Sequence, residues 1–126
     1  MMTLDSLCQH VGEERLRAMV AAFYRRVRVD DLIGPMYPAE DWEGSEKRLA
    51  DFVIYRFGGP QTYLEQRGHP RLRMRHLPFS IGLKERDRWL TLMGEAMRET
   101  GVSEEAAQVM IPFFAQVADM MRNRPE

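Results

Sequence analysis

The sequence has few of the residues that several common protein classes need. Its 126 residues include one cysteine, Cys8, which excludes an internal disulfide and a cysteine-rich metal site and gives no sign of secretion. Glycine-rich phosphate loops and the His-Glu-x-x-His metal motif are absent. No apolar run approaches the roughly 20 residues that span a bilayer, and the first residues do not form a signal peptide. We therefore expect a cytoplasmic protein that does not enter a membrane.

The charge is also low, with a formal net value of −1. A dedicated nucleic-acid-binding domain usually carries a strong positive charge, so the balance argues against nucleic acid as a partner. Hydrophobic residues make up 44% and charged residues 29% of the chain, as in an ordinary globular protein. At this length we expect one domain over residues 1–126, large enough for a core.

Apolar residues recur at helical spacing along most of the chain, and no convincing alternating strand pattern is present. Helix stops are clear at Gly12, at Gly58-Gly59-Pro60 and at Gly101, and Ser103 is a good helix N-cap. Gly34, Pro35 and Pro38 rule out a regular helix across 30–41. The pattern predicts an all-α protein. A short first helix covers 3–10, and four long helices cover 13–29, 42–57, 80–100 and 103–120. Two short helical pieces are expected at 61–66 and 71–76.

Three histidines are the candidate metal ligands. His10 ends the first predicted helix, where a cation interacts favourably with the helix dipole. His69 and His76 are separated by Pro70, which places them on different elements and makes a shared zinc site a poor explanation. Spacing alone favours a structural histidine in a helical core for His76. The alternative is an imidazole that binds a metal already held by a large apolar cofactor.

Haem would account for the mixed surroundings of His76. One histidine suffices as the iron ligand, the porphyrin needs apolar walls, and its propionates need cations. The sequence around His76 offers both kinds of residue, with Leu72, Leu77 and Phe79 apolar and Arg71, Arg73 and Arg75 basic. The Cys-x-x-Cys-His attachment motif is absent, so such a haem would be held without a covalent bond.

Oxygen bound to haem carries partial negative charge, and a phenol or indole donor in a dry pocket stabilises it. Tyr24 borders an apolar helical stripe, Tyr37 lies on the constrained connection, and Trp89 lies on the apolar face of the third long helix. Considered one at a time, each of these aromatic residues is better explained by core packing.

The sequence resembles the group II truncated haemoglobins, short bacterial and plant globins with a two-over-two helical sandwich. No single motif is specific, but the combination is, and it covers most of the chain from the first long helix to the third. The residues that carry the resemblance are Phe23-Tyr24, Met36-Tyr37-Pro38, Phe57-Gly58-Gly59-Pro60, Tyr63, Arg67-Gly68-His69-Pro70, Leu72-Arg73-Met74-Arg75-His76, Pro78-Phe79 and Glu85-Arg86-Asp87-Arg88-Trp89-Leu90.

The resemblance implies haem b, with His76 as the proximal iron ligand. It implies that Tyr24, Tyr37 and Trp89 surround the bound ligand as hydrogen-bond donors. Ser45 stands where many globins have the distal histidine, so that histidine is not available here. The other implied haem contacts are Leu49, Phe52, Val53 and Phe79 as apolar residues, with Arg48 and Arg75 as propionate partners.

From this resemblance we expect a protein that binds oxygen and related diatomic ligands. Several donors around the ligand should slow oxygen release, since each hydrogen bond contributes on the order of 1 kcal/mol. Slow release favours redox chemistry on oxygen, nitric oxide or peroxide, resembling a nitric oxide dioxygenase or a peroxidase, with electrons from a separate reductase. The alternatives are a haem-based sensor, a simple oxygen store or carrier, and a haem-independent helical module whose Arg67–Arg75 cluster binds an acidic partner.

Overall fold

The computed structural model describes residues 2–60 and 81–125, and every regular element in these two ranges is helical. The predicted helical pieces at 61–66 and 71–76 lie outside the described residues. Residues 2–60 and 81–125 contain five α-helices and two short 3₁₀ helices. Their bounds are η1 Leu4–Ser6, α1 Leu7–Val11, α2 Glu13–Arg28, η2 Gly34–Met36, α3 Trp42–Arg56, α6 Leu83–Glu99 and α7 Glu104–Met120.

Helix α2 forms where the sequence predicts the first long helix. Its apolar stripe is fully buried, and the glutamates in its first turn and arginines in its last turn suit the helix dipole. The stripe consists of Leu16, Met19, Val20, Phe23 and Val27. The first predicted helix is divided into η1 and α1, which Gly12 ends with a positive φ of 95°.

Helix α3 ends at the predicted glycine stop. Gly58 has a φ of 88°, and a Cβ built there would lie 1.8 Å from the carbonyl oxygen of Asp5. The backbone N–H of Cys8 donates to the carbonyl oxygen of Phe57 at 2.9 Å. The glycine therefore permits the end of α3 to touch the N-terminal segment at a distance that no side chain allows.

Helices α6 and α7 supply the second helical pair. Ser103 caps α7 as predicted, because its hydroxyl accepts a hydrogen bond from the N–H of Ala106 at 3.1 Å. Phe113 and Phe114 are buried, but Met120, which continues their apolar spacing in the sequence, is 50% exposed. Ala118, four residues after Phe114, takes the inward position in the last turn.

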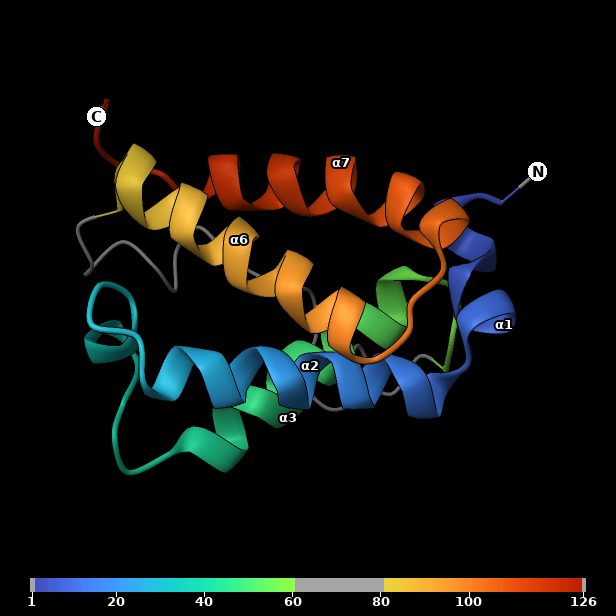
Figure 1. Ribbon diagram of the computed structural model, residues 1–126, viewed down its shortest axis with the longest axis horizontal. Coiled ribbons are helices and arrows are strands. Elements are labelled where there is room, and N and C mark those ends of the chain that lie inside the picture. The colour runs from blue at the N-terminus through green and yellow to red at the C-terminus, as the bar shows by residue number, and fades with distance from the viewer. Residues whose placement is uncertain (1, 61–80, 126) are drawn as a thin grey trace.

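The four long helices form two layers, with α2 and α3 in one and α6 and α7 in the other (Figure 1). Helix α2 contacts both α3 and α6, so its apolar stripe lies at the centre of the core. This arrangement confirms the predicted all-α, two-over-two fold. Among the described residues, no helix combines the length and the apolar character that crossing a membrane requires.

Candidate ligand-binding site

The three aromatic residues proposed as ligand donors come together in the structure. Tyr24 projects from α2, Trp89 from α6, and Tyr37 from the segment after η2. The phenol oxygen of Tyr37 accepts hydrogen bonds from the hydroxyl of Tyr24 and from the indole N–H of Trp89. The Tyr24 and Tyr37 rings lie edge to face, with centroids 5.5 Å apart. We call Tyr24, Tyr37 and Trp89 the donor trio.

Burial keeps both phenols of the donor trio protonated. It raises the pKa of Tyr24 well above the usual tyrosine value, and the neighbouring Tyr37 raises it further. Burial also raises the pKa of Tyr37 to about 12, although the hydrogen bonds from Trp89 and Tyr24 act in the opposite direction. Near neutral pH all three side chains therefore carry a hydrogen that they can donate.

Phenylalanines hold the donor trio from the core side. Phe23 lies next to Tyr24 on α2, and its ring centroid is 5.3 Å from that of Tyr24 and 5.0 Å from that of Trp89. Phe114 of α7, in the same layer as α6, contacts Trp89 at a centroid distance of 5.6 Å. The position of the indole is thus set by α2 and α7 as well as by its own helix.

Trp42 is a neighbour of the donor trio that the sequence did not reveal. Its indole stacks on Tyr37 with centroids 5.6 Å apart and planes 24° from parallel, and the Arg28 guanidinium lies 5.4 Å from the Trp42 ring. Trp42 begins α3, outside any apolar stripe, so periodicity gave no signal for this contact. Trp42 also lies edge to face with Tyr24 at a centroid distance of 6.4 Å, so it restricts both tyrosine rings.

Helix α3 places its predicted site residues along one length of the core. Ser45, Phe52 and Val53 are buried, and Leu49 is half-buried and packs against the core. Phe52 lies near Phe113 of α7, with ring centroids 6.5 Å apart. These positions agree with the predicted apolar wall of Leu49, Phe52 and Val53, which follows the small polar residue Ser45 along α3.

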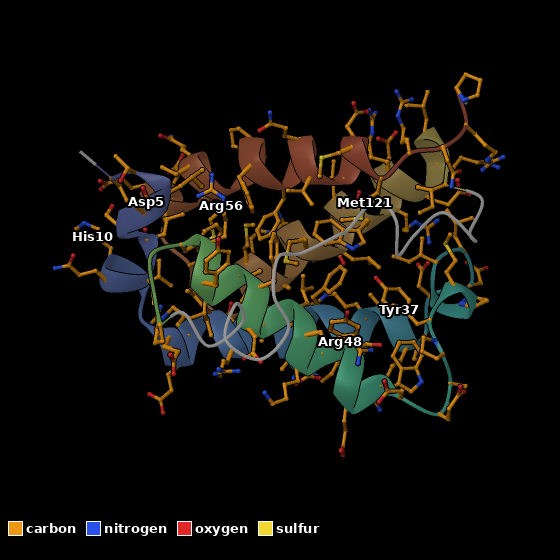
Figure 2. The ribbon with its side chains drawn as sticks, turned by 180° about the vertical axis from the view of Figure 1, so that it is seen from behind. Asp5, His10, Tyr37, Arg48, Arg56 and Met121 are labelled. Atoms are coloured by element: carbon orange, nitrogen blue, oxygen red, sulfur yellow. The ribbon has the colours of Figure 1, made fainter. Side chains whose placement is uncertain are left out.

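Arg48 lies near the middle of α3 (Figure 2). Its guanidinium donates to the carboxylate of Asp41 at 3.1 Å and to the hydroxyl of Ser45 at 3.3 Å. The side chain is 36% exposed, so it can reach an anionic group at the surface. His76, Arg75 and Phe79 lie outside the described residues, and their roles stay predictions.

The described residues fit the distal side of a haem. Two neutral donors, Tyr24 and Trp89, meet at the oxygen of Tyr37 among apolar rings, and the Arg48 cation lies close enough to Tyr24 to oppose the rise that burial causes in its pKa. Neutral donors in apolar surroundings are the chemistry that a small polar ligand requires. The helices around them form two layers of two. Fold and site together define a small globin with a hydrogen-bonding ligand site.

The comparisons with known proteins agree. A family model described as Bacterial-like globin matches residues 6–123. Group 2 truncated hemoglobin YjbI of Bacillus subtilis is 37% identical over 116 residues, which cover 92% of this chain and 87% of that protein. The chain belongs to the bacterial-like globin family and is a truncated haemoglobin of group II.

Solved structures of other haemoglobins show the same fold over more than nine-tenths of the chain. The haemoglobin of Chloroflexus aurantiacus is 45% identical, with a TM-score of 0.89 over 94% of this chain and 98% of that one. The thermostable haemoglobin of Thermobifida fusca is 43% identical, with a TM-score of 0.88 over 99% and 100%. The truncated oxygen-avid haemoglobin of Bacillus subtilis is 35% identical, with a TM-score of 0.87 over 93% and 98%.

Members of this family bind haem, usually as haem b, and this identifies the cofactor of the chain. Family membership also shows that the protein binds oxygen or other diatomic ligands. It removes the haem-independent interaction module that the basic segment of the sequence left open.

Proposed function

We propose that this globin holds oxygen tightly for redox chemistry rather than for transport. The observation that supports the proposal is the donor trio, in which Tyr24 and Trp89 both donate to the oxygen of Tyr37. A ligand oxygen placed near these side chains would find three donors already gathered at one point. Because the donors are fixed by the fold before the ligand arrives, little ordering is required when it binds.

The remaining site residues have proposed roles in holding the cofactor. His76 is the proximal iron ligand, and Arg48 and Arg75 pair with the propionates. Ser45 lies near the solvent entrance and Leu49 excludes water from the ligand. The apolar walls of the proposed site are Phe52, Val53 and Phe79.

The haem supplies an iron that binds diatomic molecules and exchanges electrons. The donor trio stabilises partial negative charge on the ligand oxygens, and the same donors help to polarise an O–O bond. The Bacillus subtilis relative is described as oxygen-avid, which is the behaviour that we propose for this chain. Turnover of nitric oxide or peroxide requires electrons from a separate reductase, and we propose the cytoplasm as the compartment of both proteins.

Oxygen dissociation rates test the donor argument. Tyr24→Phe and Trp89→Phe each remove one donor and keep an aromatic ring, so each should speed oxygen release by roughly 2- to 10-fold, the effect of one net hydrogen bond. Trp42→Phe keeps all three donors and an aromatic ring against Tyr37, so it should change the release rate less than either donor variant. Unchanged rates in both donor variants would refute the proposal for the trio.

Two further measurements test the other parts of the proposal. His76→Ala should lose the normal haem spectrum, and a variant that binds haem as the wild type does would overturn the ligand assignment. Steady consumption of nitric oxide or peroxide with a reductant, above the background of free haem, is expected for a redox protein. A store, carrier or sensor would bind these ligands without such turnover.

A further inference from the structure

Outside the donor trio, a partly buried ion pair joins the two elements that carry Trp89 and Tyr37, and the same arginine lies 3.9 Å from the exposed carboxylate of Asp31. The guanidinium of Arg88, on α6, donates to the carboxylate of Asp30, which follows the end of α2. The Asp30 side chain is 7% exposed, whereas Arg88 is 40% exposed. An ion pair with one nearly buried member is screened less by water than a pair on the open surface.

The same carboxylate also fixes the segment that leads to Tyr37. Its other oxygen accepts hydrogen bonds from the backbone N–H groups of Leu32 and Ile33, at 3.1 Å and 2.9 Å. Burial alone would raise the pKa of Asp30, but the bonds from Ile33, Arg88 and Leu32 lower it overall. The carboxylate is therefore ionised near neutral pH and holds partners from two elements.

The segment then turns back against α2. The N–H of Gly34 donates to the carbonyl oxygen of Asp30 at 3.1 Å, and a Cβ built on Gly34 would lie 2.6 Å from the carbonyl oxygen of Val27. Only glycine permits this approach of the segment to the helix. Tyr37 follows directly after the η2 turn that Gly34 begins, so its position depends on how this segment is held.

Arg88 and Trp89 are consecutive on α6, and consecutive residues of an α-helix project about 100° apart. When Trp89 faces Phe23 at a centroid distance of 5.0 Å, Arg88 projects sideways toward the end of α2. The ion pair therefore joins α6, at the position next to Trp89, to the segment that leads to Tyr37. The Trp89 donor and the Tyr37 acceptor lie on the two elements that Asp30 joins.

We propose that Asp30 and Arg88 are positioning residues that set the Trp89–Tyr37 hydrogen bond and, through it, the rate of ligand release. This inference rests on the proposed function of the donor trio and adds two residues that do not belong to it. The competing explanation is that the pair only adds stability, as many ion pairs do.

The test uses the haem-loaded protein and follows the Trp89 indole N–H by ¹⁵N–¹H NMR, with its signal assigned through Trp89→Phe. Arg88→Gln should shift this signal and speed its hydrogen exchange, because the indole loses its fixed partner. Oxygen release should accelerate roughly 2- to 10-fold, the effect of weakening a single hydrogen bond. Arg88→Lys keeps the charge and should restore much of both properties.

Arg86→Gln is the matched control. Arg86 lies on the same helix and pairs at 2.9 Å with Asp87 and Asp119, away from the donor trio, so the indole signal and the release rate should stay as in the wild type. If Arg88→Gln lowers the thermal midpoint but leaves both the indole signal and the rate unchanged, the pair is only structural and the inference is wrong.

The design separates this inference from the proposed function. Unchanged release in Tyr24→Phe and Trp89→Phe would remove the donor argument, yet the indole signal of Arg88→Gln would still report whether the pair positions Trp89. Accelerated release in Trp89→Phe together with wild-type behaviour in Arg88→Gln would keep the proposed function and overturn the inference.

Discussion

Asp51 contributes to holding α3, the helix of the proposed distal wall, against α2, and a substitution there measures that contribution to stability. Its side chain is 1% exposed and lies between two cations. Arg17 of α2 donates to one carboxylate oxygen at 3.1 Å, and Lys47, one turn earlier on α3, donates to the other at 2.9 Å. Asp51→Asn removes the negative charge and keeps the shape of the side chain.

A hydrogen bond to a charged group contributes about 1.5–3 kcal/mol. Arg17 and Lys47 are 44% and 56% exposed, so water screens both ion pairs, and the amide that replaces the carboxylate still accepts one bond. We therefore expect Asp51→Asn to lower the free energy of unfolding by about 1–2 kcal/mol at neutral pH. Guanidinium denaturation of the haem-loaded protein, followed by circular dichroism, measures this difference.

The stability difference between the wild type and Asp51→Asn should also depend on pH. Burial alone would raise the pKa of Asp51, but hydrogen bonds from Lys47 and Arg17 lower it below the value of an unfolded aspartate. The stabilisation from this charge is complete above the unfolded pKa of about 3.9 and is lost as the pH falls toward the folded value. The gap between the wild type and Asp51→Asn should therefore shrink as the solution is acidified below about pH 4.

The control is Glu43→Gln, which removes a charge from an exposed position of the same helix. It should change stability by no more than about 0.5 kcal/mol. If Asp51→Asn is as stable as the wild type, or if its deficit is the same at neutral and acid pH, the reasoning about the buried carboxylate is refuted.

Three further predictions concern single residues of the fold and the site. Gly58→Ala should destabilise the protein by about 2 kcal/mol or more in denaturant titrations, because φ is 88° and the new Cβ would strike the Asp5 carbonyl oxygen. Ser103→Ala should cost about 1 kcal/mol through loss of the α7 cap, and Ser103→Thr much less. The folded-state pKa of Tyr37 exceeds the ordinary 10.0 and reaches about 12, so its stabilising contribution is complete below pH 10 and is lost toward pH 12. Tyr37→Phe should remove one late phenol step from an alkaline absorbance titration.

Local sequence signals predicted the helices well, because they act within a few residues of each other. The stripe from Leu16 to Val27 repeats at helical spacing and is buried as one face of α2. Ser103 caps α7 through a hydrogen bond to a residue three positions later. Met120 shows the limit of this reasoning, since the periodic pattern continues to the end of α7 but the neighbouring helices do not cover that side.

Contacts between distant residues carried no such signal. Asp30 and Arg88 are 58 positions apart, and neither occurs in a pattern that indicates a partner. The stacking of Trp42 on Tyr37 depends on how the segment over 37–41 turns, which composition does not specify. Asp51 lies inside an apolar helix face, where the sequence alone gives no reason to expect two cations from two helices.

The sequence by itself determined that this chain is an all-α globin, because helical periodicity, glycine stops and a specific set of motifs are all written in short segments. It also supplied Tyr24, Tyr37 and Trp89 as candidate donors through the family resemblance. Only the tertiary structure decided that two of them donate to the third. Hydrogen-bond direction depends on the distances between side chains, and here three separate elements set those distances.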